Sequence, residues 1–190
     1  MNNEVFKPLF EAIEAAENTG KLIIAIDGGS AAGKTSLAEL LREKYGCTVF
    51  HADDFFLRPE QRTPQRLAEA GGNMDRERLK AEVLEALKKG GPVCYRPFSC
   101  RSMSLVDEVR VEPNAVVVVE GAYSMHPELE EFYGLKVFLD VDSELQKSRI
   151  LKRNEGKKAE MFFSRWIPME QRYFEELKVK ERCDIVVEIK

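Results

Sequence analysis

The sequence has few of the residues that build metal centres or disulfide scaffolds. It contains two histidines and four cysteines among 190 residues. The cysteines form no C-x-x-C pair, and the two histidines, His51 and His126, stand apart from them, which argues against a zinc site. We interpret both histidines as non-catalytic. Unpaired thiols are typical of a reducing compartment, so we expect a cytoplasmic protein.

Long apolar runs and an excess of one charge are also missing. The most apolar stretch, Ala115–Val119, is too short to cross a bilayer, and Met1–Gly20 lacks the apolar core of a signal peptide. With 29 basic and 33 acidic residues, the net charge of −4 argues against a general nucleic-acid or membrane binder. The chain has no internal repeats, and its length suits one domain over residues 1–190.

One stretch carries a specific pattern. Gly28–Thr35 has the sequence G-G-S-A-A-G-K-T, which matches G-x-x-x-x-G-K-[ST] between a predicted strand, Lys21–Ile26, and a predicted helix, Ser36–Tyr45. The glycines let successive N–H groups point at phosphate oxygens, and the helix N-terminus adds its positive dipole end. We expect Lys34 to reach the β- and γ-phosphates and the Thr35 hydroxyl to bind Mg²⁺. The predicted nucleotide-binding residues are Gly28, Gly29, Ser30, Ala31, Ala32, Gly33, Lys34, Thr35 and Ser36.

The remaining segments alternate between strand and helix patterns. Further strands are predicted at Cys47–His51, Val93–Tyr95, Ala115–Val119, Leu135–Val141 and Ile185–Ile189. Further helices are predicted at Phe6–Glu17 (ended by Thr19-Gly20), Asp75–Lys89, Ser143–Asn154 and Ala159–Lys178, with Pro168 kinking or splitting the last. This alternation predicts an α/β fold: a doubly wound, mostly parallel sheet of about five strands with helices on both faces.

Three features are expected around that sheet. A leading helix covers residues 5–18, a substrate-side excursion covers residues 54–112, and a short lid covers residues 149–160. Within the excursion, residues 58–73 are predicted to be irregular, and residues 103–112 to form a hairpin or an edge strand.

Acidic residues follow two of the strands, where ligands of such sheets bind. Asp53 is the predicted base that takes the proton of an attacking hydroxyl; a helix cap or loop pair is the alternative. Adjacent side chains of an extended chain point apart, so we expect Asp54 to serve another role. Glu120 follows buried valines and is predicted to hold Mg²⁺ with Thr35, against the alternative of a structural ion pair.

Two groups of basic and aromatic residues leave alternatives open. Arg149 and Arg153 lie four apart on one helix face, and either close over the phosphates or form an ordinary solvated face. Tyr95 and Arg101 belong to a mixed aromatic and basic segment that suits a planar polar substrate, although packing explains the aromatic rings equally well.

These motifs resemble the uridine kinase and phosphoribulokinase family of P-loop kinases, with nicotinamide riboside kinases as close relatives. The resemblance covers about residues 22–187. His51–Phe56, H-A-D-D-F-F, is similar to the D-D-F-F segment of nicotinamide riboside kinases, which implies that Asp53 is the base. Asn73-Met74-Asp75 resembles the family's N-x-D stretch and implies that Asp75 holds ribose hydroxyls. Val119-Glu120-Gly121 resembles its F-E-G.

The chain departs from uridine kinases at the segment that contacts the pyrimidine. Those enzymes carry Y-D-F-x-x-H, whereas this chain has Tyr95-Arg96-Pro97-Phe98-Ser99-Cys100 and lacks the aspartate and the histidine. Arg149 and Arg153 resemble the start of the family's arginine-rich lid, but lysines stand where further arginines are expected.

The expected function is ATP- and Mg²⁺-dependent phosphorylation of a small-molecule hydroxyl, on a nucleoside or related ribosyl compound. The predicted acceptor-binding residues are Asp54, Phe56, Asp75, Tyr95, Arg101 and Tyr123. The alternatives are a nucleotide-binding regulatory protein without transfer activity and a kinase for pantothenate or a sugar phosphate. A GTPase is disfavoured because no N-K-x-D segment is present. We expect neither a nucleic-acid nor a membrane partner, and the oligomeric state stays open.

Overall fold

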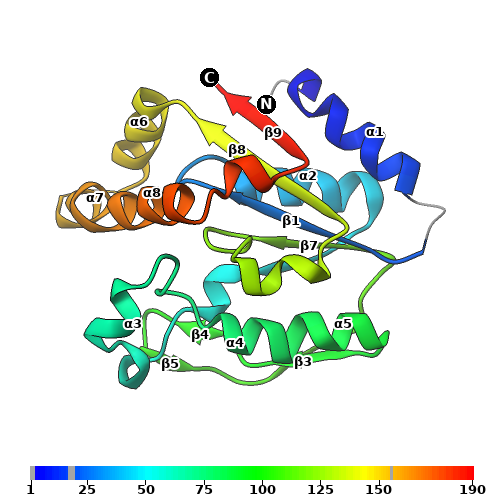
Figure 1. The fold of residues 1–190 in the computed structure, drawn as a ribbon, viewed down its shortest axis with the longest axis horizontal. Coiled ribbons are helices and arrows are strands. Elements are labelled where there is room, and N and C mark those ends of the chain that lie inside the picture. Colours follow the sequence, from blue (N-terminus) through cyan, green and yellow to red (C-terminus); the bar gives the residue numbers. More distant parts are fainter. Residues whose placement is uncertain (1–2, 17–19, 155) are drawn as a thin grey trace.

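A five-stranded parallel sheet forms the centre of the protein (Figure 1). The computed structural model describes residues 3–16, 20–154 and 156–190. The strand order is β2-β7-β1-β8-β9, and every neighbouring pair is parallel. The strands are β1 (Leu22–Gly28), β2 (Thr48–His51), β7 (Val116–Glu120), β8 (Leu135–Val141) and β9 (Ile185–Ile189). The predicted fold class is confirmed.

Helices cover both faces of this sheet. Alternate residues of β1 enter two cores: Ile23 packs on one face and Ile24 on the other, and a strand packed on both faces is apolar almost throughout. One core includes η1 (Asn3–Phe6), α1 (Lys7–Ala16) and α2 (Lys34–Tyr45). The opposite core includes α8 (Ile167–Glu176) and a helix made of α4 (Arg76–Arg78), η4 (Leu79–Leu84) and α5 (Glu85–Lys89). The predicted end of the leading helix, at residues 17–19, lies outside the described residues.

The excursion between β2 and β7 is more ordered than its sequence suggested. It contains η2 (Ala52–Phe55), η3 (Pro59–Gln61) and α3 (Pro64–Ala68) before the long helix. Helix α3 begins because the Thr63 hydroxyl accepts the Arg66 N–H at 3.1 Å and Pro64 occupies its first turn. Two short antiparallel pairs follow, β3 (Val93–Tyr95) with β6 (Val109–Val111), and between them in the chain β4 (Phe98–Ser99) with β5 (Ser104–Leu105).

Three further helices gather beyond the carboxyl ends of the strands (Figure 1). Helix α6 (Ser143–Arg153) follows β8, and α7 (Lys157–Met161) continues through a wider π turn, η6 (Phe162–Trp166), into α8. Pro168 does not split this run. Its missing N–H and the bulk of its ring are accommodated by the wide turn directly before it.

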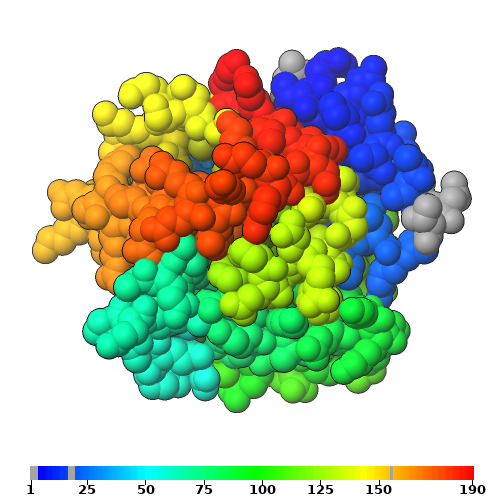
Figure 2. Space-filling view, in the orientation of Figure 1, coloured from blue at the N-terminus to red at the C-terminus, as the bar shows by residue number. Residues whose placement is uncertain are grey.

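Helix α8 also contacts the excursion. The Arg172 guanidinium donates to the carbonyl of Ala68, and Figure 2 shows the two segments in contact on one face of the molecule. The remaining short helices are η5 (Pro127–Phe132) and η7 (Lys180–Arg182). Among the described residues, no helix is both long and apolar enough to cross a membrane.

Candidate active site

The glycine-rich loop turns tightly between β1 and α2. Gly28 has a φ of +142°, and a Cβ there would lie 2.5 Å from the Leu139 carbonyl oxygen, so a larger residue does not fit. Gly33, at φ +105°, leads directly into α2. The Lys34 ammonium donates to the carbonyls of Gly28 at 2.8 Å and Gly29 at 2.9 Å. The loop therefore places a positive charge and a helix N-terminus at the carboxyl edge of the sheet.

A carboxylate stands beside this loop. The Thr35 hydroxyl donates to Glu120 Oε1 at 3.0 Å, and His51 Nδ1 lies 2.6 Å from the same oxygen. His51 and Glu120 are paired at the ends of β2 and β7, which explains their contact. The hydrogen bond to Glu120 raises the pKa of His51. The sequence analysis treated His51 as non-catalytic and left it outside the site. Its position at the end of a strand next to the Glu120 strand was the signal that could have placed it there.

These groups fit a magnesium ion that also binds phosphates. The Thr35 hydroxyl and the Glu120 carboxylate are hard oxygen donors, which Mg²⁺ prefers. The described residues contain no group of three or more histidine, cysteine, aspartate or glutamate side chains able to hold a metal by themselves. Mg²⁺ commonly combines one or two protein oxygens with waters and substrate phosphates, so this donor set suits a nucleotide-bound ion.

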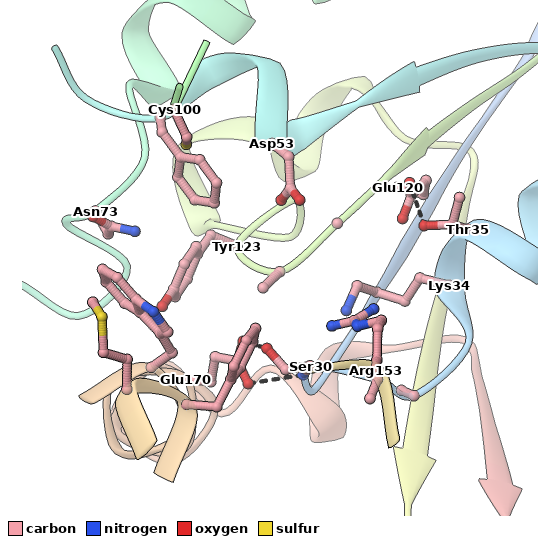
Figure 3. Close-up of a pocket in the computed structure, with 18 of the residues that line it drawn as sticks. Ser30, Lys34, Thr35, Asp53, Asn73, Cys100, Glu120, Tyr123, Arg153 and Glu170 are labelled. Carbon is pink, nitrogen blue, oxygen red and sulfur yellow. Dashed lines mark hydrogen bonds between the residues drawn. The ribbon is translucent and has the colours of Figure 1, made fainter. Parts of the chain in front are cut away.

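Asp53 faces the loop from across a cavity (Figure 3). It lies in the short 3₁₀ helix η2, directly after β2. Its side chain is open to the cavity, and the protein atoms around it partly desolvate the carboxylate, which raises the pKa of Asp53, while the charge of Lys34 opposes the shift. A raised pKa suits a carboxylate that accepts a proton.

Asp54 points elsewhere. The Tyr95 hydroxyl donates to Asp54 Oδ2 at 3.3 Å, and burial raises the pKa of Asp54. The two adjacent carboxylates thus diverge, although they lie in a 3₁₀ helix and not in the extended chain from which the sequence argument started.

The cavity has a volume of about 870 Å³ and joins the loop to the excursion and to η6 and α8. Predicted residues on its wall are Ser30 to Ser36, Asp53, Phe56, Glu120, Tyr123, Arg149 and Arg153. Lining residues that the sequence interpretation missed include Arg62, Asn73, Cys100, Arg165, Trp166 and Glu170. The available signal for Cys100 was its place at the end of the segment in which uridine kinases carry a histidine.

The two predicted arginines reach the loop side of this cavity. Arg149 donates through Nη1 to the carbonyls of Ala31 at 3.0 Å and Ala32 at 3.2 Å. The Arg153 guanidinium lies 5.8 Å from the centre of the Phe162 ring. Both side chains line the cavity, so this helix face contributes positive charge to it.

A family model described as the phosphoribulokinase / uridine kinase family matches residues 57–166. The chain belongs to this family. A uridine kinase from Chloroflexus aurantiacus is 30% identical over 146 residues, which cover 72% of this chain and 69% of that protein. Uridine kinase-like protein 3 from Arabidopsis thaliana is 23% identical over 189 residues. The aligned region covers 92% of this chain but only 40% of that longer protein.

The fold of this kinase family is shared with a solved structure described as a possible uridine kinase from Bacillus stearothermophilus. The two align with a TM-score of 0.74 and 22% identity, covering 97% of this chain and 98% of the other. The family and the P-loop kinase fold predicted from the sequence are confirmed. Membership of the family implies ATP as the phosphate donor, usually together with Mg²⁺.

Four predicted acceptor-binding residues of this family member lie outside the cavity wall: Asp54, Asp75, Tyr95 and Arg101. Asp75 is 1% exposed, and its carboxylate caps α4 by accepting the Arg78 N–H at 3.2 Å. Its other oxygen accepts a hydrogen bond from the Gln61 side-chain amide at 2.8 Å. Tyr95 stacks on Phe55 at 5.4 Å, and Arg101 is exposed. Acceptor contacts by these residues stay predictions, and for Asp75 both carboxylate oxygens already have protein partners.

Helix α8 is hydrogen-bonded to the glycine-rich loop and to the strand that precedes it. Glu170, buried at 5% exposure, accepts the Ser30 N–H at 2.8 Å and the Ser30 hydroxyl at 2.5 Å. Asp27, at the end of β1, accepts the Tyr173 hydroxyl at 2.9 Å as well as two backbone N–H groups. Burial raises the pKa of both carboxyl groups. The sequence analysis did not single out Asp27. A carboxylate at the end of an otherwise apolar strand was the signal that it has a specific partner.

Proposed function

We propose that this chain is an ATP- and Mg²⁺-dependent kinase that phosphorylates a hydroxyl group of a small molecule, a nucleoside or related ribosyl compound. The observation that supports this most strongly is the arrangement across one cavity. Asp53 faces the loop lysine, Lys34, and the Thr35–Glu120 pair lies beside that lysine (Figure 3). Binding a nucleotide alone does not require a carboxylate opposite the phosphates, whereas phosphoryl transfer to an alcohol needs a proton acceptor.

Each residue has a role that its geometry permits. The loop N–H groups and Lys34 bind the β- and γ-phosphates, and Thr35 and Glu120 hold Mg²⁺, which neutralises phosphate charge when it is bound. Asp53 takes the proton of the acceptor hydroxyl as its oxygen forms a bond to the γ-phosphorus. The bond from the γ-phosphorus to the bridging oxygen breaks, and ADP leaves. Arg149 and Arg153 neutralise the charge on the transferred group.

The acceptor side favours compounds other than uridine and cytidine. Cys100 lines the cavity at the end of the segment that lacks the aspartate and histidine of uridine kinases. A kinase for a non-nucleoside acceptor, such as pantothenate or a sugar phosphate, is therefore the second candidate. A regulatory protein without transfer activity is disfavoured, because it has no use for an Asp53 carboxylate that faces the phosphate loop.

The test is ADP release measured with uridine, cytidine, nicotinamide riboside, pantothenate and sugar phosphates. We expect one class of acceptor to stimulate ADP release. With that acceptor, Asp53→Asn should lower kcat by roughly 10²–10⁴-fold while ATP still binds. Full turnover by Asp53→Asn, or ADP release indifferent to every acceptor, would contradict the proposal.

A further inference from the structure

Five of the eight arginines in the excursion face a carboxylate. The shortest ion pair of each is Arg58–Glu60 at 3.5 Å, Arg66–Glu77 at 2.7 Å, Arg76–Glu128 at 2.9 Å, Arg78–Glu82 at 2.9 Å and Arg110–Glu112 at 2.9 Å. Arg62, Arg96 and Arg101 form no ion pair with any of the described residues, and of these three Arg62 alone lines the cavity. A guanidinium held in a binding cavity without a counter-ion is a candidate site for a ligand anion.

The Arg62 side chain is fixed at its base and open at its tip. Its Nε donates to the Leu57 carbonyl at 3.0 Å, and its guanidinium lies 5.7 Å from the centre of the Phe98 ring. Neither terminal nitrogen of Arg62 has a hydrogen-bond acceptor within the described part of the chain. These two nitrogens form the paired donor edge that binds a carboxylate or a phosphate. The orientation of the group is therefore set before a ligand arrives.

Arg62 belongs to the acceptor side of the cavity. Arg62, Cys100 and the proposed base Asp53 line the same cavity. Figure 3 shows Cys100 and Asn73 across the cavity from Lys34 and Arg153. In the proposed function, Lys34, Arg149 and Arg153 on the loop side bind the triphosphate. Arg62 is then available to bind the phosphate acceptor.

We propose that the phosphate acceptor carries an anionic group, a carboxylate or a phosphate, which Arg62 binds while the acceptor hydroxyl faces Asp53. This inference rests on the proposed kinase function and narrows its substrate class. Arg62 also contacts the altered segment, because its guanidinium lies against Phe98 of Tyr95–Cys100, where this chain lacks the aspartate and the histidine of uridine kinases.

Matched acceptor pairs test the charge requirement. Nicotinic acid riboside with nicotinamide riboside and orotidine with uridine differ in a carboxylate, and ribulose 5-phosphate with ribulose differs in a phosphate. We expect kcat/KM to favour the anionic member of at least one pair by about tenfold or more, and Arg62→Gln to remove about 10–100-fold of its kcat/KM, as for a lost charge-assisted hydrogen bond. The KM for ATP and the rate with the neutral member should not change.

Arg58→Gln is the matched control, because Arg58 belongs to the same excursion but does not line the cavity and already faces Glu60. It should retain the kcat/KM of the wild-type protein for every acceptor. A preference for the neutral member in every pair, or an equal loss with both members in Arg62→Gln, would overturn the inference.

Alkylation of Cys100 supplies a readout that needs no acceptor. The rate ratio of negatively charged iodoacetate to neutral iodoacetamide, measured on the Cys100 peptide by mass spectrometry, reports the local potential independently of the thiolate fraction. We expect Arg62→Gln to lower this ratio about threefold to tenfold and Arg58→Gln to leave it unchanged. An unchanged ratio in Arg62→Gln would refute an anion-attracting Arg62. The absence of acceptor-dependent ADP release would instead refute the kinase proposal and leave the alkylation result standing.

Discussion

The Tyr173–Asp27 contact offers a quantitative test of how helix α8 is held against the end of β1. Tyr173 and Asp27 are both fully buried, and the tyrosine hydroxyl is one of three donors to the carboxylate. Tyr173→Phe removes that donor and leaves the ring in place. A hydrogen bond to a charged group contributes about 1.5–3 kcal/mol, so we expect the free energy of unfolding to fall by about that amount. For a chain of this size, the melting temperature should fall by about 3–12 °C.

Tyr133→Phe is the matched control. Tyr133 is also buried, but its hydroxyl donates to the Ser124 backbone carbonyl at 2.8 Å, which is a neutral acceptor. Its loss should cost about 0.5–1.5 kcal/mol. Urea unfolding followed by circular dichroism at pH 7, without nucleotide, gives both values. If Tyr173→Phe cost no more than Tyr133→Phe, Asp27 would not be acting as a charged acceptor and the reasoning would fail.

The pH dependence has a definite sign. Burial raises the pKa of Asp27 in the folded protein above its ordinary value, so at a pH between these two pKa values the folded state holds a proton that the unfolded state has lost, and above both values Asp27 is charged. Asp27 therefore makes stability fall as pH rises from its unfolded pKa of about 4 through its folded pKa. Tyr173→Phe removes a donor that favours the charged form, which raises the folded pKa further. The destabilisation should accordingly be larger at pH 8 than at pH 4.

Two further predictions concern the loop. Glu120→Gln removes the charge beside Thr35, so the Mg²⁺ concentration for half-maximal activity should rise about tenfold or more; an unchanged Mg²⁺ titration would count against Glu120 as part of the metal site. Glu170→Ala leaves the Ser30 N–H and hydroxyl without their carboxylate acceptor and should raise the KM for ATP severalfold, whereas Glu170→Gln keeps an acceptor and should raise it less. Identical KM values in both variants and the wild-type protein would show that Glu170 does not position the loop.

Local patterns were sufficient for the sheet and for the phosphate loop. The loop motif, the buried valines before Glu120 and the acidic pair after β2 are all written in consecutive residues, and the ends of parallel strands meet at one edge. The sequence therefore predicted that Asp53 and Lys34 would share a site. The contact between Ser30 and Glu170 had no such signal, because it spans 140 positions and depends on how α8 packs against the loop.

The environments of Asp75 and Arg62 could not be predicted, because they depend on side chains that tertiary packing brings next to them. The Asn73-Met74-Asp75 stretch matches a family pattern, but Gln61 and the start of α4 occupy the Asp75 carboxylate. The spacing of arginines in the excursion does not distinguish Arg62 from those with ion pairs. Only the positions of the surrounding glutamates do so, and those follow from tertiary packing.

The wide turn at Phe162–Trp166 has a consequence for how the cavity wall is encoded. A π turn accommodates one more residue than an α-helical turn. Deleting one amino acid there, such as the exposed Ser164, would leave a regular α-helical turn and remove the bulge from this part of the helix. The part of the cavity wall formed by Met161, Phe162, Arg165 and Trp166 would change shape, while Glu170 would keep its place on Ser30. A length change of a single amino acid, with no altered side chain, is thus enough to redraw one side of the pocket.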